Sequence, residues 1–178
     1  TMKNLPGVRY EPYMTTPEDY MQRIEFQLST FVNGVERIPI QSTWDKLITA
    51  LKEDEEFGVQ LRKNLPNTGD LTGRLDAINS HTAKVDEIYN YVRNNMQFNG
   101  TYTFWSTDGI KHAWDKHSGT SGDINLILIN LLKKAGIETY PLLASSRDHG
   151  AINKFYPFIN QFNTVLAYVV ADGKVLIL

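Results

Sequence analysis

The amino-acid sequence predicts an α+β fold in which a buried central helix packs on an antiparallel sheet. Residues 122–135 are apolar on nearly every helical face, which is typical of a helix enclosed by other elements. Extended apolar stretches follow at 138–144, 162–171 and 174–178, and Asp172-Gly173 is a strong signal for a two-residue hairpin turn. Helices come first and strands come last, an order that favours α+β over alternating strand–helix units.

The composition excludes several classes of protein. The 178 residues are 42% hydrophobic and 21% charged, as in an ordinary globular domain, with a net charge of -2. This balance gives no electrostatic surface for nucleic acid. The absence of cysteine excludes disulfides, thiolate metal sites and a cysteine nucleophile within these residues. No stretch is long and apolar enough to insert in a membrane, and no signal peptide is visible.

The first forty residues form an extended lead-in. Residues 1–22 lack periodicity, whereas Ile24, Phe26 and Leu28 alternate with polar residues and predict a strand over 23–32. A turn at Asn33-Gly34 then leads to a second short extended piece around Ile38 and Ile40.

Helical spacing begins after this lead-in. Ser42 or Thr43 is expected to cap a helix whose apolar face carries Trp44, Leu47, Ile48 and Leu51. A further short helix is expected around 56–64.

Two loops and one helix are predicted before the central helix. Residues 65–80 are rich in turn formers and predict a loop. Apolar residues recur at helical spacing over 82–96 and predict an amphipathic helix. Residues 97–118 are aromatic and polar without periodicity, which indicates a long loop, and such loops are often functional. Gly136 is the expected left-handed end of the central helix.

Ser121 stands where a glycine turn becomes the central helix. Free N–H groups at a helix start can lower the pKa of a thiol or hold an oxyanion. A serine hydroxyl is too weak an acid to gain much from this and needs an adjacent base. The simpler interpretation is helix capping, in which Gly119 and Gly122 shape the turn and Thr120 with Asp123 has the spacing of a capping box.

Taken together, these motifs resemble the transglutaminase-like superfamily, which has a papain-like fold. The likeness is closest to bacterial envelope proteins of the Bacteroidetes type, in which a domain of unknown function, DUF3857, precedes the transglutaminase-like domain. It rests on the order and spacing of Trp44-Asp-Lys-Leu, Ile88-Tyr-Asn-Tyr-Val-Arg-Asn-Asn-Met-Gln-Phe-Asn-Gly100, Gly119-Thr-Ser-Gly-Asp-Ile-Asn-Leu, Ala135-Gly-Ile, Ser145-Ser-Arg-Asp-His-Gly150 and Phe162-Asn-Thr-Val. The resemblance implies that residues 1–40 end a preceding β-rich domain and that 41–178 form the core, truncated in its last strands.

The resemblance also implies a degenerate catalytic triad. Active relatives use a cysteine at the start of the buried helix, a histidine at the start of the next long strand and an aspartate on the neighbouring strand. The cysteine position matches Ser121, the histidine position matches Thr164, and the aspartate position would follow Leu178. We therefore expect no catalysis, and no activity from Ser121→Cys alone.

Two alternatives stay open. A serine hydrolase or acyltransferase would need Ser121 to recruit a loop histidine, namely His112, His117 or His149. A metal site from Asp108, His112, Asp115 and His117 matches no strong ligand spacing, so neither metal nor cofactor is expected.

His81 is expected to be a surface residue of a loop. The aromatic side chains Tyr102, Phe104, Trp105 and Trp114 would either line a groove or cover the central helix, and packing is favoured.

The favoured hypothesis is an inactive domain that binds through its former cleft. The cleft or binding candidates are Trp105, His112, Trp114, His117, Asp123, Arg147, His149 and Asn163. The partner would be a peptide, a glycan or a neighbouring domain of the same longer protein. A purely structural spacer or docking role inside such a protein is a third possibility. From the resemblance alone, the location is expected to be periplasmic or in the cell envelope.

Overall fold

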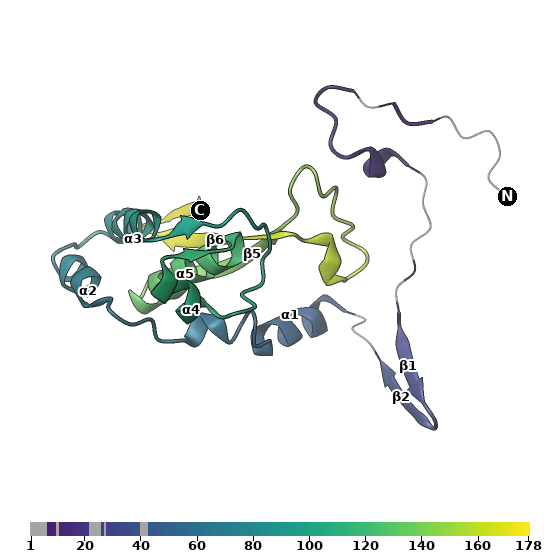
Figure 1. Cartoon of the computed structure of the whole chain (residues 1–178), viewed down its shortest axis with the longest axis horizontal. Coiled ribbons are helices and arrows are strands. Elements are labelled where there is room, and N and C mark those ends of the chain that lie inside the picture. The colour runs from purple at the N-terminus through teal and green to yellow at the C-terminus, as the bar shows by residue number, and fades with distance from the viewer. Residues whose placement is uncertain (1–6, 10, 22–25, 27, 40–42) are drawn as a thin grey trace. The chain divides into compact units, whose positions relative to one another are not determined.

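The computed structural model describes residues 7–9, 11–21, 26, 28–39 and 43–178. It divides into two compact units, of which unit 1 comprises 1–48 with 145–162 and unit 2 comprises 49–144 with 163–178. Figure 1 shows the elements along the chain. Among the described residues, no helix has the length and apolar character required to cross a membrane.

Unit 2 is built around helix α5 (Ser121–Lys134), which lies along strands β5 (Glu138–Ala144) and β6 (Thr164–Ala171) in Figure 1. The sheet is antiparallel in the order β5-β6-β7, with β7 spanning Lys174–Ile177. Alternate residues of β6 are fully buried, as expected for a strand with one face on the core. The predicted α+β arrangement, the central helix and the Asp172-Gly173 turn are therefore confirmed.

The helices of unit 2 enclose the other sides of α5. Helix α3 (His81–Asn95) and helix α4 (Ile110–Lys116) both pack on α5. The side chains that form the core have almost no exposed surface; they include Val85, Ile88, Ile110, Leu126, Ile127, Ile129, Leu132, Val165 and Val169. Burial of residues 126–132 explains why the middle of α5 carries almost no polar side chains.

The N-terminus of α3 is closed by a residue from the β6–β7 turn. The Asp172 carboxylate accepts hydrogen bonds from the Ser80 hydroxyl at 2.7 Å and from the Thr82 N–H at 2.8 Å. These contacts hold the pKa of Asp172 well below its usual range, because they favour the charged carboxylate. The hairpin turn therefore takes part in capping a helix that lies far away in the sequence.

Two predicted loops contain helices. Residues 65–80 include helix α2 (Gly69–Asp76), whose Leu71 and Leu75 are buried, so the loop prediction was wrong there. Residues 97–118 contain α4, the short strand β3 (Gln97–Phe98) and the first residue of β4 (Ser118–Gly119), and the two strands pair in parallel. Burial of a few apolar side chains stabilises these short helices in spite of their turn-forming residues.

Smaller differences concern element boundaries. The helix expected around 56–64 is a single 3-10 turn, η2 (Gln60–Arg62). The strand expected over 162–171 begins at Thr164, and His81 is the first residue of α3 rather than part of a loop.

Unit 1 contains a hairpin and a short 3-10 helix. Strand β1 (Thr30–Asn33) pairs with β2 (Glu36–Pro39) across a turn at Gly34-Val35, one residue later than the predicted Asn33-Gly34. The strand expected over 23–32 is seen only from Thr30: the described residues 26, 28 and 29 are not in a strand, so the prediction was wrong there, and residues 23–25 and 27 lie outside the described residues. Helix η1 (Pro17–Tyr20) places the Asp19 carboxylate 2.8 Å from the N–H of Ala151.

Helix α1 (Trp44–Glu53) begins in unit 1 and ends in unit 2. Thr43 is its cap, because its side chain accepts from the N–H of Lys46 at 3.3 Å. The predicted helix is therefore confirmed, and the alternative cap Ser42 lies outside the described residues.

Candidate functional site

The N-terminus of α5 is held by a capping box. The Thr120 hydroxyl accepts from the Asp123 N–H at 3.1 Å, and the Asp123 carboxylate accepts from the Thr120 N–H at 2.9 Å. The buried Ser106 hydroxyl donates to the same carboxylate. The capping box is therefore as predicted, and Asp123, a cleft candidate, is engaged in organising the helix start.

The hydroxyl and the backbone N–H of Ser121 are both engaged with the preceding loop. Its hydroxyl donates to the Thr103 carbonyl at 2.8 Å and accepts from the Thr103 N–H at 2.9 Å. Its backbone N–H donates to the Thr101 carbonyl at 3.1 Å. The hydroxyl proton and the N–H, the two groups that acyl transfer would use, are thus already bonded to loop backbone.

Gly122 allows this close approach. A Cβ on Gly122 would lie 2.6 Å from the Trp105 carbonyl oxygen and 2.9 Å from the Thr103 carbonyl oxygen, which leaves no room for a side chain. Residues 103–105 therefore pack directly against the backbone of the first turn of α5.

Thr164 opens β6 at the same end of α5. The Asn125 side-chain amide, one turn after Ser121, donates to the Val165 carbonyl at 2.7 Å. At the start of the strand, the Asn163 N–H donates to the Ala144 carbonyl at 3.1 Å. Ser121 and Thr164 thus stand at neighbouring ends of a packed helix and strand.

None of the described hydrogen bonds joins Ser121 to a histidine. His117 ends α4 with a left-handed backbone, and its Nδ1 lies 3.0 Å from the Asn95 carbonyl oxygen. The exposed His112 lines a cavity of about 270 Å³ between α4 and the start of α5, together with Thr120 and Asp123. His149 belongs to unit 1, where its Nε2 lies 2.9 Å from the Asn160 carbonyl oxygen.

The two tryptophan candidates differ in how deeply they are buried. Trp114 is only 4% exposed, and its indole N–H donates to the Pro66 carbonyl at 2.9 Å, so it belongs to the core. Trp105 is half-buried with its ring against Phe57 and Phe104. Trp105 therefore retains accessible surface within the loop whose backbone contacts the first turn of α5.

The remaining candidates lie in unit 1 or form no cluster. Arg147 lines a shallow cavity of about 290 Å³ with Tyr13 and Asp148. Within the part of the chain that the structure describes, no three or more His, Asp or Glu side chains gather in a way that could hold a metal ion.

Sequence reasoning missed the residues that engage Ser121. Thr101, Thr103 and Ser106 contact the helix start from about one helix length earlier in the chain, and no local pattern marks them. The contact of Asn125 could have been expected from the sequence. A side-chain amide on a largely apolar helix needs a hydrogen-bond partner among the elements that cover the helix.

A buried helix whose start meets the first residues of an antiparallel strand defines a papain-like α+β domain. A profile of the transglutaminase-like superfamily matches residues 70–169, and the chain belongs to this family. The crystal structure of a protein from Parabacteroides distasonis, described as a "putative protease", resembles the fold with a TM-score of 0.55 and 20% identity. The alignment covers 75% of this chain and 25% of that one, so this chain spans about a quarter of that protein. A search of curated proteins finds no match.

Proposed function

We propose that this chain is a catalytically inactive transglutaminase-like domain that binds a partner through its former active-site cleft. The partner would be a peptide, a glycan or a neighbouring domain of the same longer protein. The proposal extends to a periplasmic or envelope location and to a preceding DUF3857-type domain, which rest on the resemblance of the sequence motifs.

The hydrogen bonds of Ser121 carry this proposal. A nucleophile needs a base that removes its proton, yet the Ser121 proton points at a carbonyl oxygen of Thr103. An oxyanion needs free N–H donors, yet the Ser121 N–H is bonded to Thr101. Activation would require the loop 101–103 to leave the helix start, and Thr164 would still provide no base near neutral pH.

A direct activity test separates the proposal from the serine-enzyme alternative. The protein would be incubated with a glutamine-containing peptide and an amine acceptor, beside a Ser121→Ala control. We expect equal background rates for both. Amide hydrolysis or crosslinking that disappears in Ser121→Ala would contradict inactivity, as would labelling of Ser121 by a fluorophosphonate probe.

The variant Ser121→Cys tests whether loss of the thiol alone explains the expected inactivity. We expect Ser121→Cys to remain inactive, because position 164 still lacks an imidazole. Adding Thr164→His to Ser121→Cys tests whether the missing imidazole is what keeps the single variant inactive. Turnover by Ser121→Cys alone, at a rate above the Ser121→Ala background, would show that another group of the chain acts as the base.

Binding is tested at the same cleft. Peptides and oligosaccharides would be titrated into the ¹⁵N-labelled protein, and we expect shifts around Ser121, Thr164 and the Trp105 indole for the ligand class that binds. The variant Trp105→Ala should weaken that binding. Shifts confined to residues far from these three would argue against use of the former cleft.

A further inference from the structure

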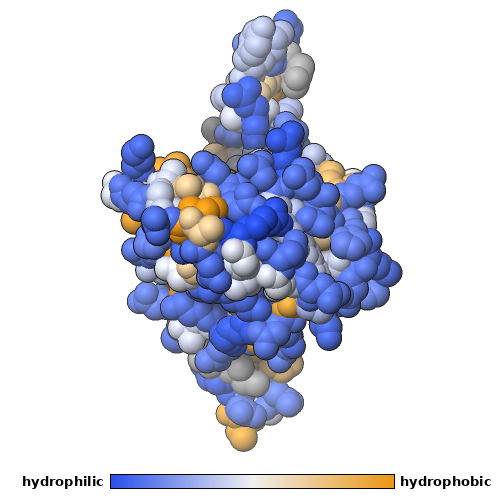
Figure 2. Space-filling view, turned by 90° about the vertical axis from the view of Figure 1, so that its left-hand side faces the viewer, coloured by the Kyte–Doolittle hydropathy of each residue, from blue (hydrophilic) through white to orange (hydrophobic). Residues whose placement is uncertain are grey.

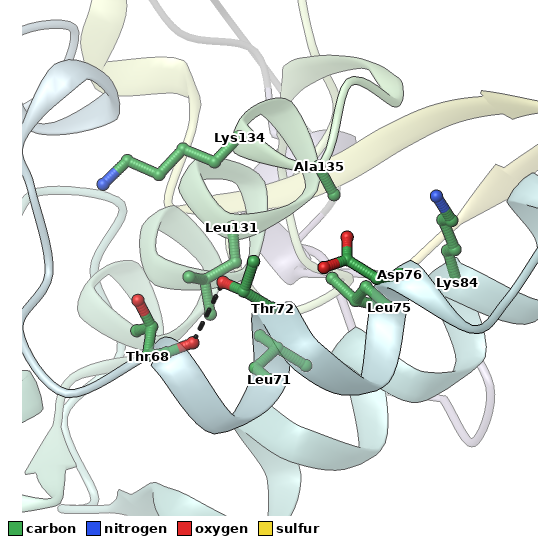
Figure 3. Close-up of a pocket in the computed structure, with 9 residues that line it drawn as sticks. All are labelled: Thr68, Leu71, Thr72, Leu75, Asp76, Lys84, Leu131, Lys134 and Ala135. Atoms are coloured by element: carbon green, nitrogen blue, oxygen red, sulfur yellow. Dashed lines mark hydrogen bonds between the residues drawn. The ribbon is translucent and has the colours of Figure 1, made fainter.

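A small cavity lies between α2 and the C-terminal end of α5, at the opposite end of α5 from Ser121. Its volume is about 230 Å³, and Figure 3 shows the residues around it. Three leucines contribute the apolar part of the lining, and Leu71, Leu75 and Leu131 are each less than a tenth exposed. These leucines, which are packed in the core of unit 2, form the inner wall of the cavity.

One end of this cavity carries a cation without an acidic partner. Lys134 lines it, and none of the ion pairs among the described residues involves this lysine. Thr68 lies at the same end in Figure 3, and its side chain makes no capping bond to α2. The two side chains leave an ammonium group and a hydroxyl available to a ligand.

The other end is electrically balanced. Asp76 and Lys84 lie there together in Figure 3, so the surplus positive charge of the lining belongs to Lys134. Partial burial lowers the pKa of Lys134, and a carboxylate beside it would favour the charged form again. The lining is thus polarised, with an apolar middle and a cation at one end.

The volume limits the size of the ligand. A cavity of about 150 Å³ is known to hold benzene, so about 230 Å³ accommodates a ring or a short branched chain together with one carboxylate. We propose that this cavity binds a small monocarboxylate with an apolar body, its carboxylate at Lys134 and Thr68 and its body against the leucines. The site is about 20 Å from Ser121 along α5 and is independent of the function proposed above.

The first experiment compares a carboxylate with its neutral isostere. The ¹⁵N-labelled full chain would be titrated with phenylacetate, with phenylacetamide and, as a branched aliphatic acid, with 4-methylpentanoate. We expect saturable shifts at residues 68–76 and 131–135 with a dissociation constant on the order of 1 mM for the acids. Phenylacetamide should bind about tenfold more weakly, because it loses the charge-assisted hydrogen bond.

Matched variants then test the role of the cation. Lys134→Gln should weaken phenylacetate binding about tenfold and leave phenylacetamide unaffected. Lys133→Gln removes the same charge from the adjacent residue, whose ammonium lies 6.0 Å from the Tyr140 ring and outside the cavity, and should bind like the wild type. Thr72→Phe, at an exposed position of α2, should fill the cavity and abolish binding of all three compounds.

Three outcomes would overturn the proposal: no saturable shift by about 20 mM of either acid, equal losses in Lys133→Gln and Lys134→Gln, or shifts outside 68–76 and 131–135. Retention of the wild-type amide spectrum away from the substitution shows that each variant is folded.

Discussion

At the scale of single residues, Asp172 couples a hairpin turn to the start of a helix. Its carboxylate accepts from the Ser80 hydroxyl, the Thr82 N–H and the His81 N–H, the last at 3.3 Å. The φ angle of Asp172 is 49°, a left-handed conformation that asparagine also adopts readily. Asp172→Asn therefore removes the charge without straining the turn.

We expect Asp172→Asn to lower the melting temperature at neutral pH. Because the pKa of Asp172 is depressed in the folded protein, its stabilising contribution is complete above the unfolded pKa of about 3.9. This contribution is lost as the pH falls from there towards the folded pKa. The difference between variant and wild type should therefore shrink in melts at pH 3 compared with pH 7.

Asp115→Asn provides the matched control, since Asp115 is exposed and forms none of the described hydrogen bonds or ion pairs. It should melt like the wild type at both pH values. If Asp172→Asn shows the same deficit at pH 3 as at pH 7, ionisation of Asp172 does not cause the effect.

At the scale of elements, the contact between loop 103–105 and the first turn of α5 depends on glycine. We expect Gly122→Ala to destabilise the fold by about 2 kcal/mol or more, because its Cβ would meet backbone atoms of Phe104 and Trp105 at 2.8 and 2.6 Å. Gly73→Ala on α2 has no atom within 4 Å of its new Cβ and should be stabilising by about 0.5–1 kcal/mol. Urea unfolding of both variants gives the comparison. Similar midpoints for the two would show that the loop moves away from α5 at little cost.

Elements with strong periodicity could be predicted from the sequence. The helices α3 and α5 and the strands β5 to β7 were each found within about two residues. For α3, α5 and β6 the reason is a periodic buried face or continuous burial, and for β7 it is the Asp172-Gly173 turn signal before a short apolar run. Helix α2 was missed since Pro66, Asn67, Gly69 and Gly73 indicate a turn, whereas its helical state depends on burial of two leucines. The parallel pairing of β3 and β4 is only two residues long in each strand and has no sequence signal.

For the candidate site, the sequence indicated where Ser121 lies in the fold but not which residues it contacts. Ser121 at the start of α5 and its capping box with Asp123 follow from local residue types. The bonds from Ser121 to Thr101 and Thr103 depend on how an irregular loop folds back. Such contacts are set by tertiary packing, which local patterns do not encode.

At the scale of the whole molecule, the two units differ in how much apolar surface they bury. Most described side chains of the β1–β2 hairpin are exposed, and an isolated two-stranded hairpin is marginally stable. Helix α5 and strand β6 in unit 2 lie in a continuous core. Local opening should therefore require much less free energy in the hairpin than in unit 2.

Hydrogen exchange measures this difference directly. We expect amides of α5 and β6 to exchange about a thousandfold or more slowly than those of β1 and β2, since the core opens only by global unfolding. Mass spectrometry of the full chain resolves both regions. If the amides of β1 and β2 exchanged as slowly as those of α5 and β6, the hairpin would have to be stabilised by contacts outside those of the described residues.

The long separation between Asp172 and the helix it caps has a consequence for the order of folding. During synthesis, Ser80 is made 92 residues before its partner, and the core strand β6 is also made after α3. A nascent α3 therefore has an incompletely capped first turn until the β6–β7 hairpin has left the ribosome. Ribosome-bound chains that stop before residue 172 should fray at this end of α3, and completion of the hairpin should end the fraying in a late, cooperative step.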